Sequence, residues 1–282
     1  MLKKGINYLS FVSGTDVKTA VKLAKNAQFE GIELMLCEDG IAGMKGRNQV
    51  KEAKKIIEES GLEASGFSST LHWSYPLTSS DPNIVKKSKD SVRRQLEIAA
   101  ELGTDTALVV PGMVAADFMP GCEICDYDVA YKRALEAIGE LKEYAKVVKV
   151  SIGIENVGNK LLVSPIEMRD FIDKINSEYV GAYFDVGNVL YQSGGYPEQW
   201  IKILGKRIKM VHFKDYRRVP GGLDAFVDLL AGDVNYPAVV EALEAVGFDG
   251  YCNAEMLPPY KYYSDQIIYN TSASMDRILK RK

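Results

Sequence analysis

The sequence predicts a (β/α)8 TIM barrel, an α/β fold in which helices surround a closed sheet of eight parallel strands, built as a single domain over residues 1–282. Eight short runs rich in β-branched and aromatic residues alternate with segments of helical spacing. The run ALVV at 107–110 is apolar throughout, as expected of parallel strands that are buried on both faces. No GxGxxG motif follows the first run, which disfavours a doubly wound dinucleotide-binding sheet.

The expected strands are short and evenly distributed along the chain. They lie near residues 4–10, 31–36, 63–69, 106–111, 150–156, 180–186, 208–214 and 250–256. Longer connections follow the third, fourth and seventh strands, at 73–80, 112–126 and 216–235. In a barrel these connections open on the catalytic face, at the carboxyl ends of the strands.

The helices between the strands carry recognisable start and stop signals. Starts are expected at Thr15-Asp16, at Asp81-Pro82 and at the capping box Ser164-Pro165-Ile166-Glu167. Stops are expected at Ser60-Gly61, Leu102-Gly103 and Val246-Gly247. Asp233 or Asn235 is expected to cap the helix that begins near Pro237.

Composition excludes several classes of protein. Apolar residues make up 46% and charged residues 26% of the chain, which is ordinary for a folded domain and unlike a disordered one. The net charge of -3 disfavours binding to nucleic acid. No apolar stretch approaches the roughly 20 residues that span a bilayer, and no signal sequence opens the chain, so a cytoplasmic location is expected.

The four cysteines do not form a pattern that indicates chemistry. Cys37, Cys122, Cys125 and Cys252 are too few and too scattered for a disulfide framework in a chain of this length. Cys122 and Cys125 form a lone CxxC pair, which we interpret as part of an ordinary loop in preference to a redox or zinc site.

Four polar residues stand at the ends of four successive apolar runs in the second half of the chain. They are Glu155 in VSIGIEN, Asp185 in VGAYFDVGN, His212 in IKMVHFKD and Glu255 in GYCNAEM. Because adjacent strands lie about 4.8 Å apart, barrel closure brings such residues together. Three carboxylates and an imidazole suit one divalent ion, and Mn²⁺, Mg²⁺, Co²⁺ and Zn²⁺ all remain open.

A single acid at a strand end is ordinarily a solvated or salt-bridged residue. Here the three acids directly follow Ile154, Phe184 and Ala254, and an unpaired charge beside apolar strand residues is costly to desolvate. A shared cation would satisfy all three carboxylates. The pattern therefore predicts that the four residues are metal ligands.

Candidate substrate-binding residues follow the third and seventh strands. His72, in SSTLHWSYP, is expected to bind a substrate oxygen, with capping of a loop as the alternative. The neighbouring Trp73 either forms an apolar wall against a sugar ring or seals the barrel mouth. Lys214, Arg217 and Arg218 follow the histidine strand and either meet a phosphate or sugar hydroxyls or lie on a solvated loop.

The ligand set indicates a reaction type. A cation that holds the carbonyl and neighbouring hydroxyl of an α-hydroxy ketone stabilises the enediolate formed when a C–H proton is removed. If one carboxylate takes the proton and a second returns one to the opposite face, the carbon is inverted; a single shuttling acid gives aldose–ketose isomerisation instead. Glu155 and Glu255 lie on strands far enough apart to flank a ligand, so both are predicted to be catalytic.

The sequence resembles the xylose isomerase-like superfamily of sugar phosphate isomerases and epimerases. The matching segments cover most of the chain: GIEL at 31–34, IEN at 154–156, FDVGN at 184–188, HFKD at 212–215, LLAGDVNYPAVVEAL at 229–243 and NAEM at 253–256. The resemblance implies that Glu155, Asp185, His212 and Glu255 hold the metal, as in the ketose 3-epimerases of that family. It also implies that the two glutamates act from opposite faces of the substrate.

Two details of the resemblance bear on the substrate. Ketose 3-epimerases carry a histidine three residues after the metal-binding aspartate, whereas this chain has Asn188, more like the pentulose-phosphate epimerases. The family also carries a substrate-binding arginine a few residues beyond the metal-binding histidine. Arg217 and Arg218 both fit that position.

We therefore expect a divalent-metal-dependent isomerase or epimerase of a small ketose or sugar phosphate. The alternative is a dehydratase of the inosose type on the same barrel. A nuclease resembling the AP endonucleases is disfavoured, because two histidines cannot furnish a multi-zinc site and the net charge is negative. A non-catalytic sugar-binding barrel is a further alternative. Assembly into a homo-oligomer is compatible with the sequence, which does not decide it.

Overall fold

Eight parallel strands close into a barrel. The computed structural model describes residues 1–42, 44, 46, 48–257 and 260–281. The barrel strands are β1 (Lys3–Asn7), β2 (Gly31–Cys37), β4 (Glu63–Ser69), β5 (Thr106–Val109), β6 (Ser151–Glu155), β7 (Val180–Asp185), β8 (Ile208–Phe213) and β11 (Tyr251–Ala254). They are hydrogen-bonded in the order β1-β11-β8-β7-β6-β5-β4-β2, and a parallel pairing of β2 with β1 closes the ring. The predicted TIM barrel is confirmed.

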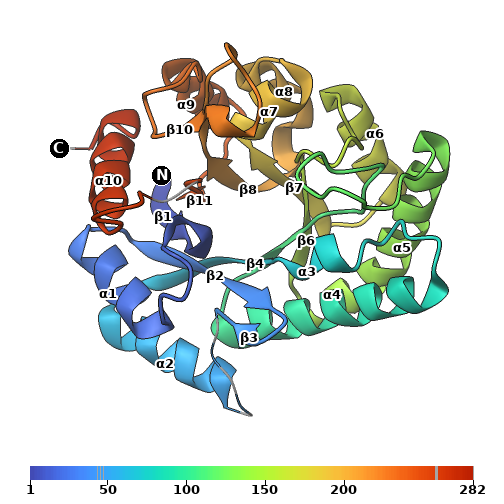
Figure 1. Ribbon diagram of the computed structural model, residues 1–282, viewed down its shortest axis with the longest axis horizontal. Coiled ribbons are helices and arrows are strands. Elements are labelled where there is room, and N and C mark those ends of the chain that lie inside the picture. The colour runs from blue at the N-terminus through green and yellow to red at the C-terminus, as the bar shows by residue number, and fades with distance from the viewer. Residues whose placement is uncertain (43, 45, 47, 258–259, 282) are drawn as a thin grey trace.

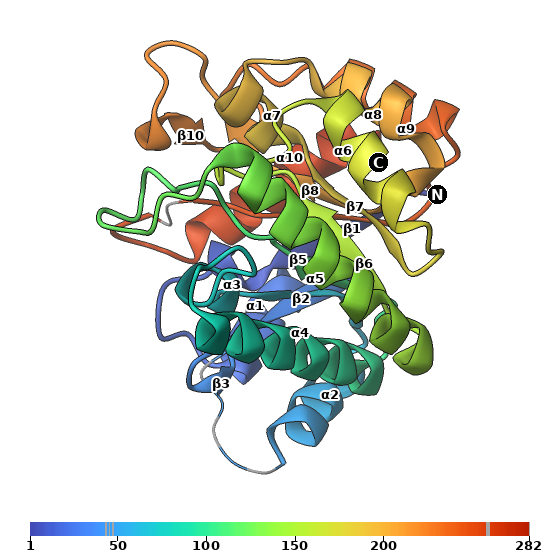
Figure 2. The ribbon, with the colours of Figure 1, turned by 90° about the vertical axis from the view of Figure 1, so that its right-hand side faces the viewer.

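Helices surround the strands, as Figure 1 shows in the view that looks onto the barrel. The outer helices are α1 (Val17–Asn26), α2 (Gln49–Ser60), α4 (Pro82–Leu102), α5 (Tyr127–Val148), α6 (Pro165–Ile175), α8 (Pro197–Leu204), α9 (Tyr236–Ala245) and α10 (Gln266–Ile278). The long helices α4 and α5 lie side by side on the outer layer (Figure 2). Within the described residues, no helix is long and apolar enough to cross a membrane.

The predicted helix starts form as expected. Asp16 and Asp81 accept hydrogen bonds from the amides of Thr19 and Asn83 at the starts of α1 and α4. Ser164 accepts from the amide of Glu167, as in a capping box, although the Glu167 carboxylate accepts from the amide of Val163 instead of Ser164.

The predicted stops and the cap of α9 are also observed. Gly61 and Gly103 end their helices in the left-handed conformation, with φ of 73° and 93°. The helix α9 ends at Ala245, one residue before the predicted stop, and Asn235 accepts from the amide of Ala238 at its start.

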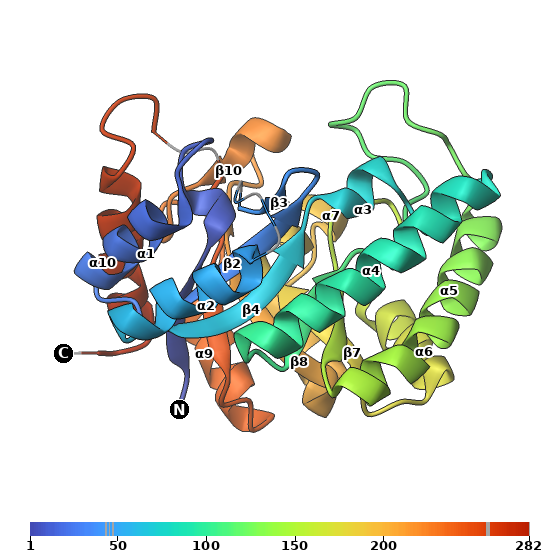
Figure 3. The same cartoon turned by 90° about the horizontal axis from the view of Figure 1, so that it is seen from below.

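Several short elements lie at the carboxyl ends of the strands and were not predicted from the sequence. They are α3 (Leu71–Ser74), α7 (Val186–Ser193), β3 (Gly40–Ile41) and an antiparallel pair of β9 (Asp215–Tyr216) with β10 (Phe226–Val227). Figure 3 shows β3, β10 and α3 at one end of the barrel and the N-terminus at the other. The first strand is shorter than expected, because the Asn7 side chain accepts from the amide of Leu9 and turns residues 8–10 into a 3-10 helix.

Side chains fill the space inside the barrel, which we call the lumen. Tyr183 reaches across it from β7 and donates to the carboxylate of Glu33 on β2, with an oxygen–oxygen distance of 2.7 Å. Gly66 on β4 makes room for this side chain, since a Cβ atom there would lie 2.4 Å from the Tyr183 hydroxyl oxygen. Leu108, Met210 and Tyr251 pack with Tyr183 in one apolar cluster.

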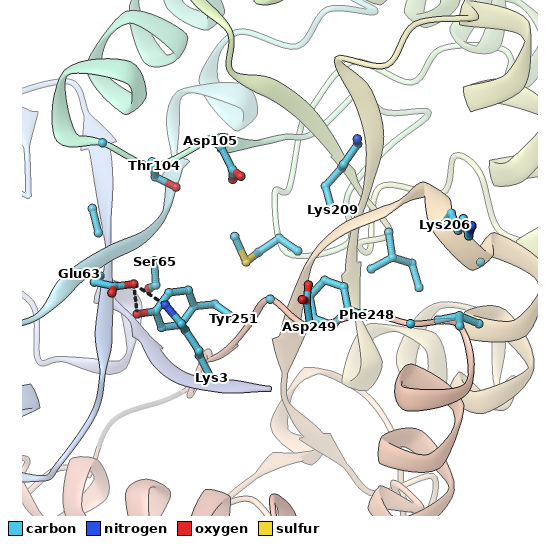
Figure 4. A pocket seen from close by; sticks show the side chains of 18 residues that line it. Lys3, Glu63, Ser65, Thr104, Asp105, Lys206, Lys209, Phe248, Asp249 and Tyr251 are labelled. Atoms are coloured by element: carbon cyan, nitrogen blue, oxygen red, sulfur yellow. Dashed lines mark hydrogen bonds and ion pairs between the residues drawn. The ribbon is translucent and has the colours of Figure 1, made fainter. Parts of the chain in front are cut away.

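A pocket of about 720 Å³ opens at the amino-terminal ends of the strands. Lys3, Glu63, Lys209 and Tyr251 line it, and both the Lys3 ammonium and the Tyr251 hydroxyl contact the Glu63 carboxylate at 2.8 Å (Figure 4). Active sites of such barrels lie at the opposite end, so the amino-terminal end is associated with stability. The predicted metal ligands do not line this pocket.

Candidate metal centre

The four predicted metal ligands lie together at the carboxyl end of the barrel. One potential ligand atom from each of Glu155, Asp185, His212 and Glu255 lies within 4.8 Å of the other three. Glu155 and Asp185 are the last residues of β6 and β7, His212 is in β8, and Glu255 follows β11. All four side chains are buried. Closure of the sheet therefore brings together residues that lie tens of positions apart in sequence, as expected.

Asp185 is oriented by the start of α7. Its Oδ1 accepts from the amide of Asn188 at 2.8 Å, so the carboxylate caps the helix and leaves Oδ2 facing the cluster. The Asn156 side chain holds the backbone of Asp185 with two hydrogen bonds of 2.9 and 2.8 Å. Within the motif FDVGN, Asp185 is therefore both a predicted ligand and the N-cap of α7.

Glu155 and Glu255 are placed from different sides of the cluster. The side-chain amide of Asn188 donates to Oε1 of Glu155 at 3.4 Å and to the backbone oxygen of Asn156 at 3.1 Å. The amide of Glu255 donates to the backbone oxygen of Phe213 at 3.0 Å, which continues the ladder between β11 and β8. Both carboxylates therefore extend from backbone that the barrel fixes.

Glu33 contacts His212 on the side away from the cluster; the sequence shows Glu33 only as part of the GIEL match. Nε2 of His212 lies 2.9 Å from Oε2 of Glu33, and Tyr183 and Asn253 donate to the same oxygen at 2.7 and 2.8 Å. With Nε2 directed at Glu33, Nδ1 faces the cluster. A carboxylate behind the histidine is the usual partner of a metal-binding imidazole.

The Lys214 side chain enters the same cluster. Its Nζ lies 3.1 Å from Oδ2 of Asp185 and 2.5 Å from Oε2 of Glu255. From the sequence, Lys214 was expected either to meet a phosphate or sugar hydroxyls or to lie on a solvated loop. In the structure its ammonium is an ion-pair partner of two predicted metal ligands.

The environment moves the pKa values of the carboxyl groups apart. Burial raises the pKa of Glu155 to about 7 and also raises the pKa of Asp185. Burial alone would raise the pKa of Glu255 as well, but the Lys214 ammonium and the His212 ring outweigh it and hold that pKa below its usual value. Carboxyl groups with separated pKa values in one site are characteristic of acid–base chemistry.

The donor set and its geometry fit one divalent cation. Nδ1 of His212 lies 3.1 Å from a carboxylate oxygen of Glu255 and 3.8 Å from one of Glu155 and one of Asp185. Oδ2 of Asp185, Nδ1 of His212 and Oε2 of Glu255 are buried and make no hydrogen bond of regular geometry. Buried polar atoms without such bonds need an explanation. A shared cation would bind these atoms and would also neutralise the carboxylates.

The residues predicted after the third strand lie at the mouth of the lumen. His72 is buried in α3, and its Nε2 donates to the backbone oxygen of Leu108 at 3.2 Å. Burial lowers the pKa of His72 to about 4. Trp73 is partly buried against the lumen cluster and meets the ring of Phe118 edge-on, with centroids 4.7 Å apart.

The two arginines after the seventh strand are engaged with backbone carbonyls. The Arg217 Nε donates to the oxygen of Ala231 at 3.0 Å. The Arg218 guanidinium donates to the oxygens of Gly194 and Gly195. In this conformation both groups stabilise loops at the catalytic face.

The CxxC pair lies in the loop that leads into α5. Cys122 and Cys125 are free thiols, and Cys122 contacts the backbone of Ala116. A guanidinium nitrogen of Arg133 lies 3.6 Å from the sulfur of Cys125.

Comparison with known proteins shows the same fold over the full chain. The D-psicose 3-epimerase of Clostridium cellulolyticum H10, solved with D-tagatose, superimposes with a TM-score of 0.78 at 18% identity, covering 99% of each chain. The 3-keto-D-glucoside 4-epimerase of E. coli superimposes with a TM-score of 0.75 at 15% identity, covering 99% of this chain and 100% of that one. At these identities the likeness establishes the fold.

Sequence comparison identifies the family. The chain is 26% identical over 186 residues to the uncharacterized protein MJ1311 of Methanocaldococcus jannaschii; the match covers 63% of this chain and 59% of that protein's length. A family model described as xylose isomerase-like TIM barrel matches residues 21–271. The chain therefore belongs to the xylose isomerase-like TIM barrel family.

Proposed function

We propose that this protein is a divalent-metal-dependent epimerase or isomerase of a small ketose or sugar phosphate. The observation that carries the proposal is the buried cluster of three carboxylates and one imidazole at the carboxyl end of the barrel. Glu155, Asp185, His212 and Glu255 would hold the ion. When bound, a divalent ion supplies Lewis acidity to the carbonyl of an α-hydroxy ketone.

The protein's own groups would carry the protons. Glu155 and Glu255 come from β6 and β11, which two other strands separate, so a sugar lying over the cluster has one carboxylate on each side. One glutamate removes the proton from the carbon next to the carbonyl, and the other delivers a proton to the opposite face of the resulting enediolate. The net result is inversion at that carbon.

The catalytic face offers further groups to a sugar. We propose that Asn188, which donates to Glu155, also meets a substrate hydroxyl, and that Lys214, Arg217 and Arg218 bind a phosphate or hydroxyl groups on the side of β8. His72 and Trp73 would bound the site on the side of α3. The epimerases of similar fold act on D-psicose and on a 3-keto-D-glucoside according to their names, which supports a keto sugar as the substrate class.

Incubation in D₂O tests this proposal. Purified protein would be stripped of metal with a chelator, reloaded with Mn²⁺ or Co²⁺, and incubated with a panel of pentuloses, hexuloses and their phosphates. We expect metal-dependent uptake of deuterium beside the carbonyl together with formation of the epimer. A product that has lost water would identify a dehydratase, and full activity in the metal-free protein would contradict the proposal.

A further inference from the structure

Lys214 directs its positive charge at the oxygens that would bind the metal. Nζ lies 2.5 Å from Oε2 of Glu255 and 3.1 Å from Oδ2 of Asp185. The same two oxygens face Nδ1 of His212, at 3.1 and 3.8 Å. The ammonium therefore contacts two carboxylate oxygens that belong to the predicted ligand set.

The charge of the cluster explains why a lysine is held there. Glu155, Asp185 and Glu255 are buried side by side, and buried carboxylates are strongly destabilising unless a cation balances them. Lys214 is itself buried, with 7% of its side chain exposed. One ammonium neutralises part of the charge that a divalent ion would neutralise more completely.

The backbone of Lys214 is fixed, whereas its side chain is long. The Tyr236 hydroxyl donates to the backbone oxygen of Lys214 at 2.9 Å. The start of α7 packs closely against the same residue, because a Cβ atom on Gly187 would lie 2.5 Å from the Cβ of Lys214. Four methylene groups then carry the ammonium, so its position can change while the strand stays in place.

The Lys214 ammonium also lies over an aromatic ring. The ring of Phe226 has its centroid 5.6 Å from Nζ in the present position. Phe226 belongs to β10, which pairs with β9 directly after Lys214. An aromatic face attracts a cation at this range, so a rotation of the side chain away from the carboxylates can retain or shorten the contact with Phe226.

We infer that Lys214 is a resident counter-ion that competes with the divalent metal for Asp185 and Glu255, and that metal binding moves its ammonium off these carboxylates toward Phe226 and the bound sugar. This inference rests on the proposed metal site. It assigns Lys214 a role in the metal-free protein as well as in the loaded one. Metal affinity would then be set by the lysine together with the four ligands.

Calorimetric titration of the metal-free protein with Mn²⁺ alone tests the inference without any substrate. In Lys214→Met, a side chain of similar length without charge replaces the competitor, and we expect the affinity for Mn²⁺ to rise by about tenfold or more. The metal-free variant should unfold at a temperature lower by about 5 °C or more, because the carboxylates lose their counter-ion. The matched control is Lys209→Met, in β8, the strand that precedes Lys214, where the side chain lines the pocket at the other end of the barrel.

Lys214→Gln and a structure of the wild-type protein with Mn²⁺ complete the test if Lys214→Met does not fold. Unchanged Mn²⁺ affinity in the folded variant, or an ammonium still within 3.1 Å of Asp185 with metal bound, would overturn the inference. If the wild-type protein bound no divalent metal at all, the proposed function would fail as well. If the wild-type protein bound metal and the Lys214 substitutions left the affinity unchanged, the inference would be wrong and the proposed function would stand.

Discussion

Oε2 of Glu33 lies 2.9 Å from Nε2 of His212, and both side chains are fully buried in the lumen. Two further donors, the Tyr183 hydroxyl and the Asn253 side-chain amide, point at the same oxygen. This arrangement fixes the ring orientation of His212 and directs Nδ1 to the carboxylate cluster. Glu33 contacts the predicted ligand and no other part of the cluster in the contacts described, so we class it as a positioning residue.

Replacing Glu33 by Gln should weaken metal binding by about 10- to 100-fold, because the neutral amide supports the imidazole less strongly. Calorimetric titration with Mn²⁺ measures this change. Glu63→Gln is the matched control: it removes a carboxylate near the amino-terminal end of β4, in the pocket of Figure 4, and should leave metal affinity unchanged. Equal affinities in wild type and Glu33→Gln would refute the positioning role.

Asp185→Asn separates the two roles of that residue. Asparagine also accepts from the Asn188 amide, so the cap of α7 is retained and the fold should persist. The variant loses the charge on Oδ2, and the stabilisation that Mn²⁺ gives should disappear. In wild type, a metal concentration 100 times the dissociation constant adds about 2.7 kcal/mol to the free energy of unfolding. Thermal unfolding with and without Mn²⁺ measures this stabilisation. If Mn²⁺ raised the unfolding temperature of the variant as much as that of wild type, Asp185 would not be a ligand.

His72 should make the protein sensitive to acid. Its pKa is about 4 in the folded protein and about 6.5 in an unfolded chain, so between these values the unfolded state binds more protons. The contribution of neutral His72 to the free energy of unfolding is present above pH 6.5 and is lost as the pH falls towards 4. Between pH 7 and pH 4.5 the free energy of unfolding, measured with urea, should fall in both proteins. We expect the fall to be about 2 to 3 kcal/mol smaller in His72→Gln than in wild type. Identical losses in the two proteins would show that His72 titrates normally.

The ion pair of Lys4 with Asp276 joins the first strand to the last helix. The Lys4 ammonium is buried, 2.6 Å from the Asp276 carboxylate and 2.9 Å from the Ser272 hydroxyl. Asp276→Ala leaves this ammonium with the Ser272 hydroxyl and the ring of Phe29 but no counter-ion, and the free energy of unfolding should fall by about 3 kcal/mol. Asp90→Ala removes an exposed partner of Lys86 and Arg93 and should have no measurable effect. A similar, small effect of both substitutions would mean that the Lys4 pair does not stabilise the closed barrel.

The ligand cluster could be predicted from sequence because its members share a simple rule. Each of Glu155, Asp185, His212 and Glu255 stands at or beside the end of an apolar run, and barrel closure brings such ends together. The alternation of strands and helices, with capping residues such as Asp16 and Ser164, was sufficient for the fold. Both the cluster and the order of elements follow from local sequence patterns together with a single topology, the closed parallel barrel.

Other features depend on the direction of single side chains, which spacing does not encode. Glu33 lies inside a strand opposite Gly66, whose missing Cβ leaves room for the Tyr183 hydroxyl that donates to Glu33. The ion pairs of Lys214 with Asp185 and Glu255 could not be predicted, because four rotatable bonds let the ammonium reach several positions from one backbone site. The pairing of β9 with β10 was missed because two-residue strands carry no periodic signal.

The central claim is that two glutamates act from opposite faces of one substrate, and deuterium exchange in D₂O with Glu155→Gln and Glu255→Gln tests it most directly. Both variants would be loaded with Mn²⁺, checked for bound metal, and supplied with the substrate that the panel identifies. The account predicts that net epimerisation is abolished in each variant, while one variant still exchanges the proton on the face served by its remaining glutamate. Epimerisation at the wild-type rate in either metal-loaded variant would contradict the two-base assignment.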